Sequence, residues 1–340
     1  MADPSSMVTG TERRVFRFGR SRGVAALRHY DAAPEEVWNA WTDPARLARW
    51  LGEVTGDRRE GGTVRVHLGN PGEPDAVATC QVLRCDPPRR LTATWSFPGE
   101  RDSAVDLRLH PDGSGSTLRL EHVGLAQARL ALGSGWETVL LRLGEFLHGA
   151  DPARLPWSET EPTLAPLWSA RAEVAETDDR WPSAVSTAET STLECGRDVA
   201  APADQVWAAV TDPNRLARWF ASVEGEQQIG GAWTATFSNG KAHGVVEECV
   251  PGERLVTSWR WDHEPDGATP ARVTLSLHPS ESGTSVTLTQ RGPATPAATG
   301  LAAGWYAHLA GLASYLGGSE PAETDWNADF ALARVVLRDQ

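Results

Sequence analysis

The chain has 340 residues, of which 40% are hydrophobic and 23% are charged, and its formal net charge at pH 7 is −13. This length exceeds that of one typical hydrophobic core, so we expect more than one domain. The acidic balance, without clustered basic residues, argues against nucleic acid as a partner, and the apolar runs are too short to insert into a membrane.

The amino-terminal segment, residues 1–23, is polar and rich in arginine. It lacks the basic region followed by an apolar stretch that marks a signal peptide, so we expect a soluble, cytoplasmic protein. Its one alternating stretch, Val15 to Phe18, is compatible with a strand. We therefore expect residues 1–23 to form an arm on the first domain.

The pattern of residues 24–149 returns in residues 191–318, which predicts two tandem copies of one domain. Each copy begins with a short strand, at about 24–30 and 191–198, that leads into Ala-Ala-Pro. The proline suits the first turn of a helix. Asp43 and Asp212, in the repeated Thr-Asp-Pro, are suited to cap a second short helix that carries Leu-Ala-Arg-Trp.

Alternating strands follow the two short helices in each copy. In residues 62–68 the apolar set is Val64, Val66 and Leu68, which places Arg65 and His67 on the opposite face. Further strands are predicted at about 77–84, 91–97, 104–110 and 117–122, and in the second copy at about 232–238, 243–250, 255–263, 271–278 and 284–290.

Each copy ends in a longer helix, because apolar residues recur at helical spacing from Trp136 to Leu147 and from Trp305 to Leu316. Residues 150–190 form an acidic, proline-containing linker. Its three tryptophans indicate that it packs on a domain or bridges the two. In the tail, residues 319–340, the segment from Trp326 to Val336 suits one further amphipathic helix.

The four cysteines, Cys80, Cys85, Cys195 and Cys249, form no CxxC pair. On a regular strand Cys80 and Cys85 would point to opposite faces, because they are five residues apart. We expect four largely buried thiols in a reducing compartment, with neither a disulfide nor a metal site.

The repeated Ala-Pro, Val-Trp, Thr-Asp-Pro, Leu-Ala-Arg-Trp, Gly-Gly and Gly-Trp signals, with Pro87-Pro88-Arg89-Arg90-Leu91 to Trp95 in the first copy, resemble the START-like superfamily, also called SRPBCC or Bet v 1-like. Within it the chain is similar to the branch of the activator of Hsp90 ATPase. The resemblance implies an α+β fold of two tandem helix-grip domains. In each, a curved antiparallel sheet wraps around the long C-terminal helix, two short helices follow the first strand, and a cavity opens between sheet and helix.

Strand and helix phases select the side chains that we expect inside the two domains. His122 lies in the core-facing phase of the first copy, and Gln290 is its counterpart in the second. His308 lies in the apolar stripe of the last helix, and His263 extends an inward row of tryptophans. The candidate catalytic residues are His308 and His263, and the candidate ligand-binding residues are Trp233, Trp259, Trp261, Gln290, Trp305, His122, Trp95 and Trp136.

Each of these residues also has a purely structural interpretation. A buried histidine or glutamine can simply satisfy a backbone or side-chain partner, and the paired tryptophans can be packing residues between helix and sheet. Trp233, Trp259 and Trp261 lack full counterparts in the first copy and could instead form a flat aromatic wall for a planar ligand. Because it carries these three tryptophans, we expect the second copy to be better suited to binding a ligand, and the first copy could be mainly structural.

Three functions remain open from the sequence. The first is binding of a hydrophobic, aromatic or polyketide-like small molecule, with cofactor-free cyclisation or dehydration by proton transfer through His308 or His263. The second is a non-catalytic carrier or a self-resistance protein that sequesters its ligand. The third is a protein-interaction module similar to the Hsp90 regulator, which would act through an outer face.

Overall fold

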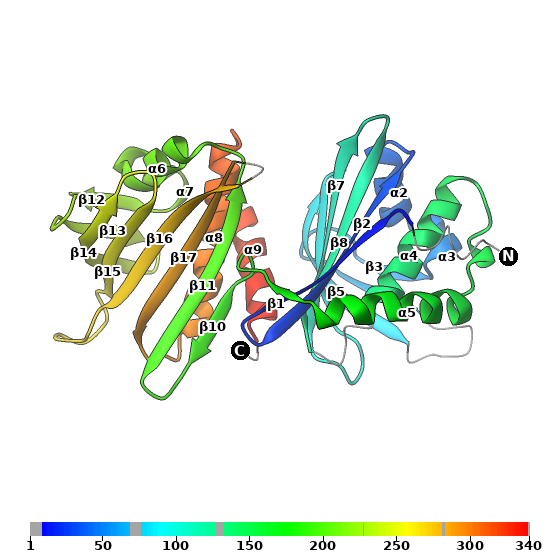
Figure 1. Ribbon diagram of the computed structural model, residues 1–340, viewed down its shortest axis with the longest axis horizontal. Coiled ribbons are helices and arrows are strands. Elements are labelled where there is room, and N and C mark those ends of the chain that lie inside the picture. The colour runs from blue at the N-terminus through cyan, green and yellow to red at the C-terminus, as the bar shows by residue number, and fades with distance from the viewer. Residues whose placement is uncertain (1–8, 69–75, 127–131, 227, 281–282, 339–340) are drawn as a thin grey trace. The chain divides into compact units, whose positions relative to one another are not determined.

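The computed structural model describes residues 9–68, 76–126, 132–226, 228–280 and 283–338. The chain divides into two compact units, one formed by Met1–Arg17 and Ser21–Thr177 and the other by Phe18–Arg20 and Asp178–Gln340. We call them domain 1 and domain 2. Each contains one large sheet and helices (Figure 1), so the fold is α+β with two tandem domains of similar element order.

The sheet of domain 1 has the strand order β3-β4-β5-β6-β7-β8-β2-β1-β9. Neighbours from β3 to β8 are antiparallel, as are β8 and β2, whereas β9 joins β1 in parallel. The strands are β1 (Thr11–Phe18), β2 (Ser21–Tyr30), β3 (Val54–Gly56), β4 (Thr63–His67), β5 (Val77–Asp86), β6 (Arg90–Trp95), β7 (Ser103–Asp112), β8 (Gly115–Leu125) and β9 (Glu176–Thr177).

The two short helices of domain 1 begin as their sequences predict. Helix α2 (Pro34–Thr42) and helix α3 (Pro44–Trp50) both start with proline, and the Asp43 carboxylate accepts a hydrogen bond of 3.0 Å from the Arg46 amide. This bond satisfies one of the free N–H groups at the start of α3. The start of α3, directly after α2, is therefore set by local capping.

The long helix α4 (Leu132–Leu147) packs against β2 and forms the centre of the domain 1 core. Leu140 and Leu143 are fully buried on it, and Leu120 on β8 is fully buried in the same core. The Tyr30 hydroxyl donates a hydrogen bond of 2.9 Å to the Leu140 carbonyl, which ties β2 to the middle of the helix. Sheet and helix thus enclose a single core.

Strand β1 of the arm and most of the linker belong to domain 1. The linker forms the 3-10 turn η2 (Pro152–Arg154) and helix α5 (Trp157–Glu173), which packs on α4. Glu137 on α4 is completely buried and accepts hydrogen bonds from Arg13 of β1, at 2.7 and 2.5 Å, and from the Trp168 indole of α5, at 2.8 Å. One carboxylate therefore joins three elements that are distant in sequence.

Domain 2 repeats the sheet with the order β10-β11-β17-β16-β15-β14-β13-β12, in which all neighbours are antiparallel. Its strands are β10 (Ser183–Ser186), β11 (Thr190–Val199), β12 (Ser222–Gly225), β13 (Ala232–Phe237), β14 (Gly240–Val250), β15 (Arg254–Trp261), β16 (Ala271–Ser280) and β17 (Gly283–Pro293). Its helices are α6 (Ala203–Thr211), α7 (Pro213–Trp219), α8 (Ala298–Leu316) and α9 (Glu323–Val336).

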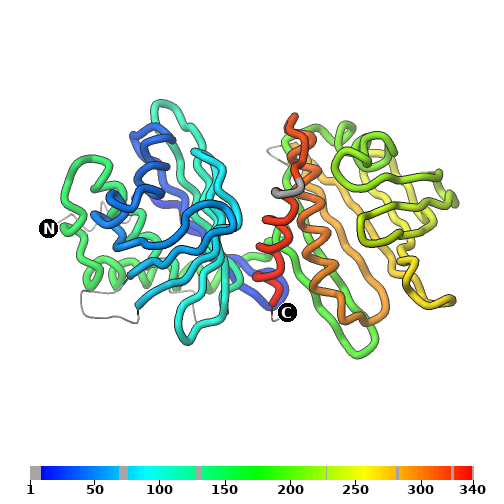
Figure 2. The backbone as a smooth tube through the Cα atoms, turned by 180° about the vertical axis from the view of Figure 1, so that it is seen from behind, coloured from blue at the N-terminus to red at the C-terminus, as the bar shows by residue number. Residues whose placement is uncertain are grey.

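The long helix α8 packs against β11, and the tail helix α9 lies along α8, as Figure 2 shows in orange and red. The helix that the sequence predicts in the tail is therefore confirmed. From the linker, Trp181 stacks on Tyr306 of α8, with ring centroids 5.8 Å apart and an angle of 15° between the rings. The linker tryptophans Trp168 and Trp181 are thus buried in different domains.

Candidate functional site

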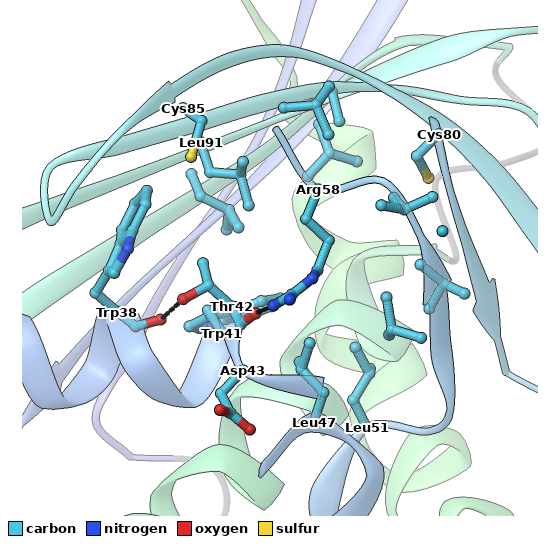
Figure 3. Close-up of a pocket in the computed structure, with 18 of the residues that line it drawn as sticks. Trp38, Trp41, Thr42, Asp43, Leu47, Leu51, Arg58, Cys80, Cys85 and Leu91 are labelled. Atoms are coloured by element: carbon cyan, nitrogen blue, oxygen red, sulfur yellow. Dashed lines mark hydrogen bonds between the residues drawn. The ribbon is translucent and has the colours of Figure 1, made fainter. Parts of the chain in front are cut away.

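Domain 1 encloses a cavity of about 700 Å³ between its sheet, the two short helices and α4. Figure 3 shows its lining, with side chains of α2 and α3 on one side and strand residues on the other. Most of the lining is aliphatic or aromatic, and the polar residues lie together at the ends of α2 and β3. The aliphatic residues of the wall are Leu47, Leu51, Val54, Val64, Val66, Val82, Leu91, Ala93, Val105 and Leu107.

Four tryptophans from three elements complete this wall: Trp38, Trp41, Trp95 and Trp136. Trp38 and Trp41 are three residues apart on α2 and therefore share one face of the helix. Trp95 of β6 and Trp136 of α4 meet edge to face, with centroids 5.1 Å apart. The cavity thus offers aromatic surface from both its helical and its sheet sides.

His122 lies behind the tryptophan wall and does not line the cavity. The Trp136 indole N–H donates to Nδ1 of His122 at 2.9 Å, so the ring proton sits on Nε2, which lies 2.8 Å from Ser103 Oγ. Burial lowers the pKa of His122 to about 3, so the ring is neutral at pH 7. This histidine positions Trp136, and the structure gives it no surface on which to contact a ligand directly.

The placement of the cysteines corrects the sequence expectation. Cys80 and Cys85 both line the cavity, although a regular strand would separate them. The pairing of β5 with β6 shifts register between Val82 and Arg84, and such a bulge inserts one residue and reverses the facing of those that follow. Burial raises the pKa of the Cys80 thiol to about 12 and also raises that of Cys85, so both are protonated thiols at neutral pH.

Exposed charged residues lie at the edge of the cavity, directly after β3. Asp57 and Arg59 form a bidentate pair, with distances of 3.0 and 2.8 Å, and this contact with Arg59 lowers the pKa of Asp57 to about 2. The Arg58 side chain extends towards α2 and donates a hydrogen bond to the Thr42 carbonyl (Figure 3). The ends of α2 and β3 are thereby connected across the opening.

The corresponding cavity of domain 2 is much smaller, at about 100 Å³. Larger side chains occupy the equivalent positions, since Phe220 stands where domain 1 has Leu51 and Trp233 stands where it has Val64. Gly244 pairs with Trp233 and makes room for the indole, because a Cβ atom at that glycine would overlap the ring. In domain 1 the partner of Val64 is Cys80, and the space stays open because valine is much smaller than tryptophan.

The aromatic residues expected to form a ligand wall in domain 2 pack mainly on one another. Trp259 lies 5.1 Å from Trp233 and 5.0 Å from Trp305, measured between ring centroids. The Trp233 indole donates to Thr257 Oγ1 at 2.6 Å. Trp233, Trp259 and Trp305 still border the small cavity, whereas Trp261 does not. The cluster therefore fills most of the volume that is open in domain 1.

Gln290 repeats the arrangement of His122. Its Oε1 accepts a hydrogen bond of 2.6 Å from the Trp305 indole, just as His122 accepts one from Trp136. Gln290 is buried and does not border the small cavity. Both copies thus use a strand residue to hold the tryptophan of the long helix.

The two candidate catalytic histidines lie in different environments. His308 borders the small cavity of domain 2, with its ring 4.9 Å from Phe220 and 5.7 Å from Trp326 of the tail helix. Burial lowers its pKa to about 4, opposed by a hydrogen bond to the Trp219 backbone. Its Nδ1 has no hydrogen-bond partner within the described ranges.

His263 does not extend an inward row, which corrects the sequence expectation. Strand β15 ends at Trp261, and His263 lies beyond it with its side chain 69% exposed. Its ring stacks on Trp261 with centroids 5.8 Å apart. Because the strand ends two residues earlier than predicted, the alternation that placed His263 inside does not reach it.

Sequence reasoning missed five residues that line the larger cavity, namely Trp38, Trp41, Arg58, Cys80 and Cys85. A signal for some of them was present. Trp41 has Val210 as its counterpart, and the larger Trp233 of copy two has the smaller Val64. The larger Trp233 and Phe220 of copy two, against Val64 and Leu51, indicate more open space in the first copy, whereas Trp41 against Val210 alone would indicate less.

Two features are absent from the part of the chain that the structure describes. No cluster of three or more histidine, cysteine, aspartate or glutamate side chains suited to a metal ion occurs there. None of the helices described is long and apolar enough to cross a membrane.

Comparison with known proteins places both repeats in one family. The model of the Activator of Hsp90 ATPase homolog 1-like protein family matches residues 31–148 and 200–317. No curated protein sequence matches the chain.

Solved structures similar to the chain include CalU16 from Micromonospora echinospora. Its crystal structure has 38% sequence identity and a TM-score of 0.41, covering 48% of this chain and 98% of CalU16. Its solution structure has 35% identity and a TM-score of 0.42, covering 51% and 99%. DynU16, from the dynemicin biosynthetic locus, has 18% identity and a TM-score of 0.35, covering 86% of this chain and 98% of DynU16.

Proposed function

We propose that this chain, which belongs to the Activator of Hsp90 ATPase homolog 1-like family, binds a hydrophobic, aromatic or polyketide-like small molecule in the cavity of domain 1. The observation that carries the proposal is the volume of about 700 Å³ enclosed by aliphatic residues and four tryptophans. Small-molecule sites typically occupy about 300–1,000 Å³ and are mainly apolar with a few polar groups. The cavity has the size and the lining of such a site.

The tryptophans favour an aromatic ligand over an aliphatic one. Indole rings pack edge to face or offset against other rings, and such pairs are worth about 0.5–1.5 kcal/mol beyond the area that they bury. Trp38 and Trp95 come from opposite sides of the cavity, one from α2 and one from β6. A planar ring system between them would meet aromatic surface on both sides.

We propose binding without chemistry, as in a carrier or a sequestering protein. Proton transfer needs a group whose pKa lies near the working pH and which reaches the ligand. His308 borders the other cavity, and the thiol of Cys80 is kept protonated by burial. The described lining of the large cavity contains no histidine or glutamate. This favours the carrier or sequestration hypothesis over cyclisation through His308 or His263.

A cavity-filling substitution tests the proposal. Val64→Trp places in domain 1 the residue that fills the equivalent position of domain 2. Equilibrium dialysis of the full chain against the neutral aromatic probe 2-acetonaphthone should show binding to the unmodified protein. The variant should bind at least about tenfold more weakly, because the indole occupies the space of the probe.

Val245→Trp is the matched control, because Val245 is an exposed valine of β14. It should leave the dissociation constant unchanged, and thermal unfolding of both variants checks that each chain is folded. Equal binding by the Val64 variant and the unmodified chain would overturn the proposal. So would loss of binding on His308→Ala, since that result would place the ligand in domain 2.

A further inference from the structure

Arg58 is a cation at the opening of an otherwise apolar cavity, and the described residues supply it with no carboxylate partner. Its guanidinium donates to the Thr42 carbonyl, which is neutral, and no ion pair to Arg58 occurs in the described part of the chain. A guanidinium has five N–H donors in a planar fork. Arg58 therefore keeps most of its donors and its full charge available on the cavity side of α2.

The two nearby carboxylates are engaged with other groups. Both oxygens of Asp57 bind Arg59, and the Arg59 amide also donates to Asp57 at 3.1 Å. Asp43 caps α3 through the Arg46 amide, and Figure 3 shows its carboxylate directed away from Arg58. Neither carboxylate forms an ion pair with Arg58 in the described structure, and the lowered pKa of Asp57 is due mainly to its hydrogen bonds with Arg59, to which the charge of Arg58 adds least.

The cavity thus has an aromatic lining, and Arg58 lies at its edge without an ion-pair partner among the described residues. A carboxylate matches the planar fork of arginine and binds it through charge-assisted hydrogen bonds. We propose that the ligand of domain 1 is an aromatic carboxylate, with its rings among the tryptophans and its acid group on Arg58. This inference rests on the proposed function and names the chemical class of its ligand.

The second repeat provides a natural comparison for this position. Counting from the shared Gly-Gly, the residue of the second copy that corresponds to Arg58 is Gln227, a neutral residue. Arg58→Gln therefore introduces the residue of the sister domain. Arg58 is exposed, so its replacement should leave the fold intact.

The test compares 2-naphthoate with 2-acetonaphthone, which has the same rings and a neutral group in place of the acid. Equilibrium dialysis of the full chain at pH 7.5 should give a naphthoate dissociation constant that rises at least about fivefold in Arg58→Gln. The constant for acetonaphthone should change less than twofold. Arg65→Gln is the matched control, because Arg65 alternates on β4 with the cavity residues Val64 and Val66 and points away.

The outcomes separate this inference from the proposed function. If naphthoate binding is unchanged in Arg58→Gln, or falls equally in Arg65→Gln, the role of Arg58 is refuted while binding of acetonaphthone leaves the cavity proposal standing. If the unmodified chain binds neither probe, both proposals fail. Added salt should weaken naphthoate binding and leave acetonaphthone binding unaffected, because only the first includes an ion pair.

Discussion

At the scale of single residues, the two domains hold the same tryptophan with different partners. Trp136 donates to His122, and Trp305 donates to Gln290. Histidine and glutamine both supply a buried acceptor, but only histidine can take up a proton. Domain 1 therefore contains an acid-sensitive group in its core at a position where domain 2 has none.

We predict that His122→Gln reduces the loss of stability in acid. The folded pKa of about 3 lies below the ordinary value of 6.5, so stability is full above about pH 6.5 and falls as the pH drops towards 3, by at most about 1.4 kcal/mol per pH unit. The difference in melting temperature between the two chains, followed from pH 7 to pH 4, should shift in favour of the variant. An exposed histidine, His278, is the control, and an equal shift in His278→Gln would contradict the assignment.

Sequence phase correctly placed His122 and Gln290 inside, because strand alternation depends only on local geometry. Their role as partners of the helix tryptophans could not be predicted, since it depends on the distance between a strand and a helix that are apart in the chain. The prediction that His263 points inward was wrong for a related reason. Where a strand ends is decided by tertiary packing, and β15 ends at Trp261.

At the scale of elements, the bulge in β5 changes the lining of the candidate site. The register shift between Val82 and Arg84 brings both Cys80 and Cys85 to the cavity. The shift recurs in β14 between Val246 and Glu248. Alternation alone cannot reveal a bulge, because the inserted residue shows only as two adjacent buried side chains, here Val82 and Leu83.

Docking of α5 on α4 depends on a glycine. A Cβ atom on Gly133 would overlap the Trp168 ring, whereas one on Gly135 would meet the Trp157 ring at an ordinary 3.5 Å. We predict that Gly133→Ala destabilises the chain by about 1–3 kcal/mol and that Gly135→Ala does not, although alanine favours the helix at both positions. Denaturant unfolding of the two variants measures the difference, and equal stabilities would contradict this packing.

At the scale of the whole molecule, duplication has produced two similar sheets with unequal interiors. The repeats, the order of elements and the tail helix follow from the sequence, because capping residues and apolar periodicity recur in both copies. The sequence suggested that copy two has the better pocket, but the cavity of copy one is the larger, at about 700 Å³ against about 100 Å³. The tryptophans that suggested a binding wall, such as Trp233 and Trp259, occupy the cavity, and the smaller Val64 and Leu51 leave space in copy one.

The unequal cavities imply that one intact chain binds one aromatic ligand and binds it in domain 1. Native mass spectrometry of the full chain, titrated with 2-acetonaphthone, tests this most directly. We expect a single bound probe per chain at saturation, retained in His308→Ala and absent in Val64→Trp. Two bound probes per chain, or one probe that persists in Val64→Trp and disappears in His308→Ala, would contradict it.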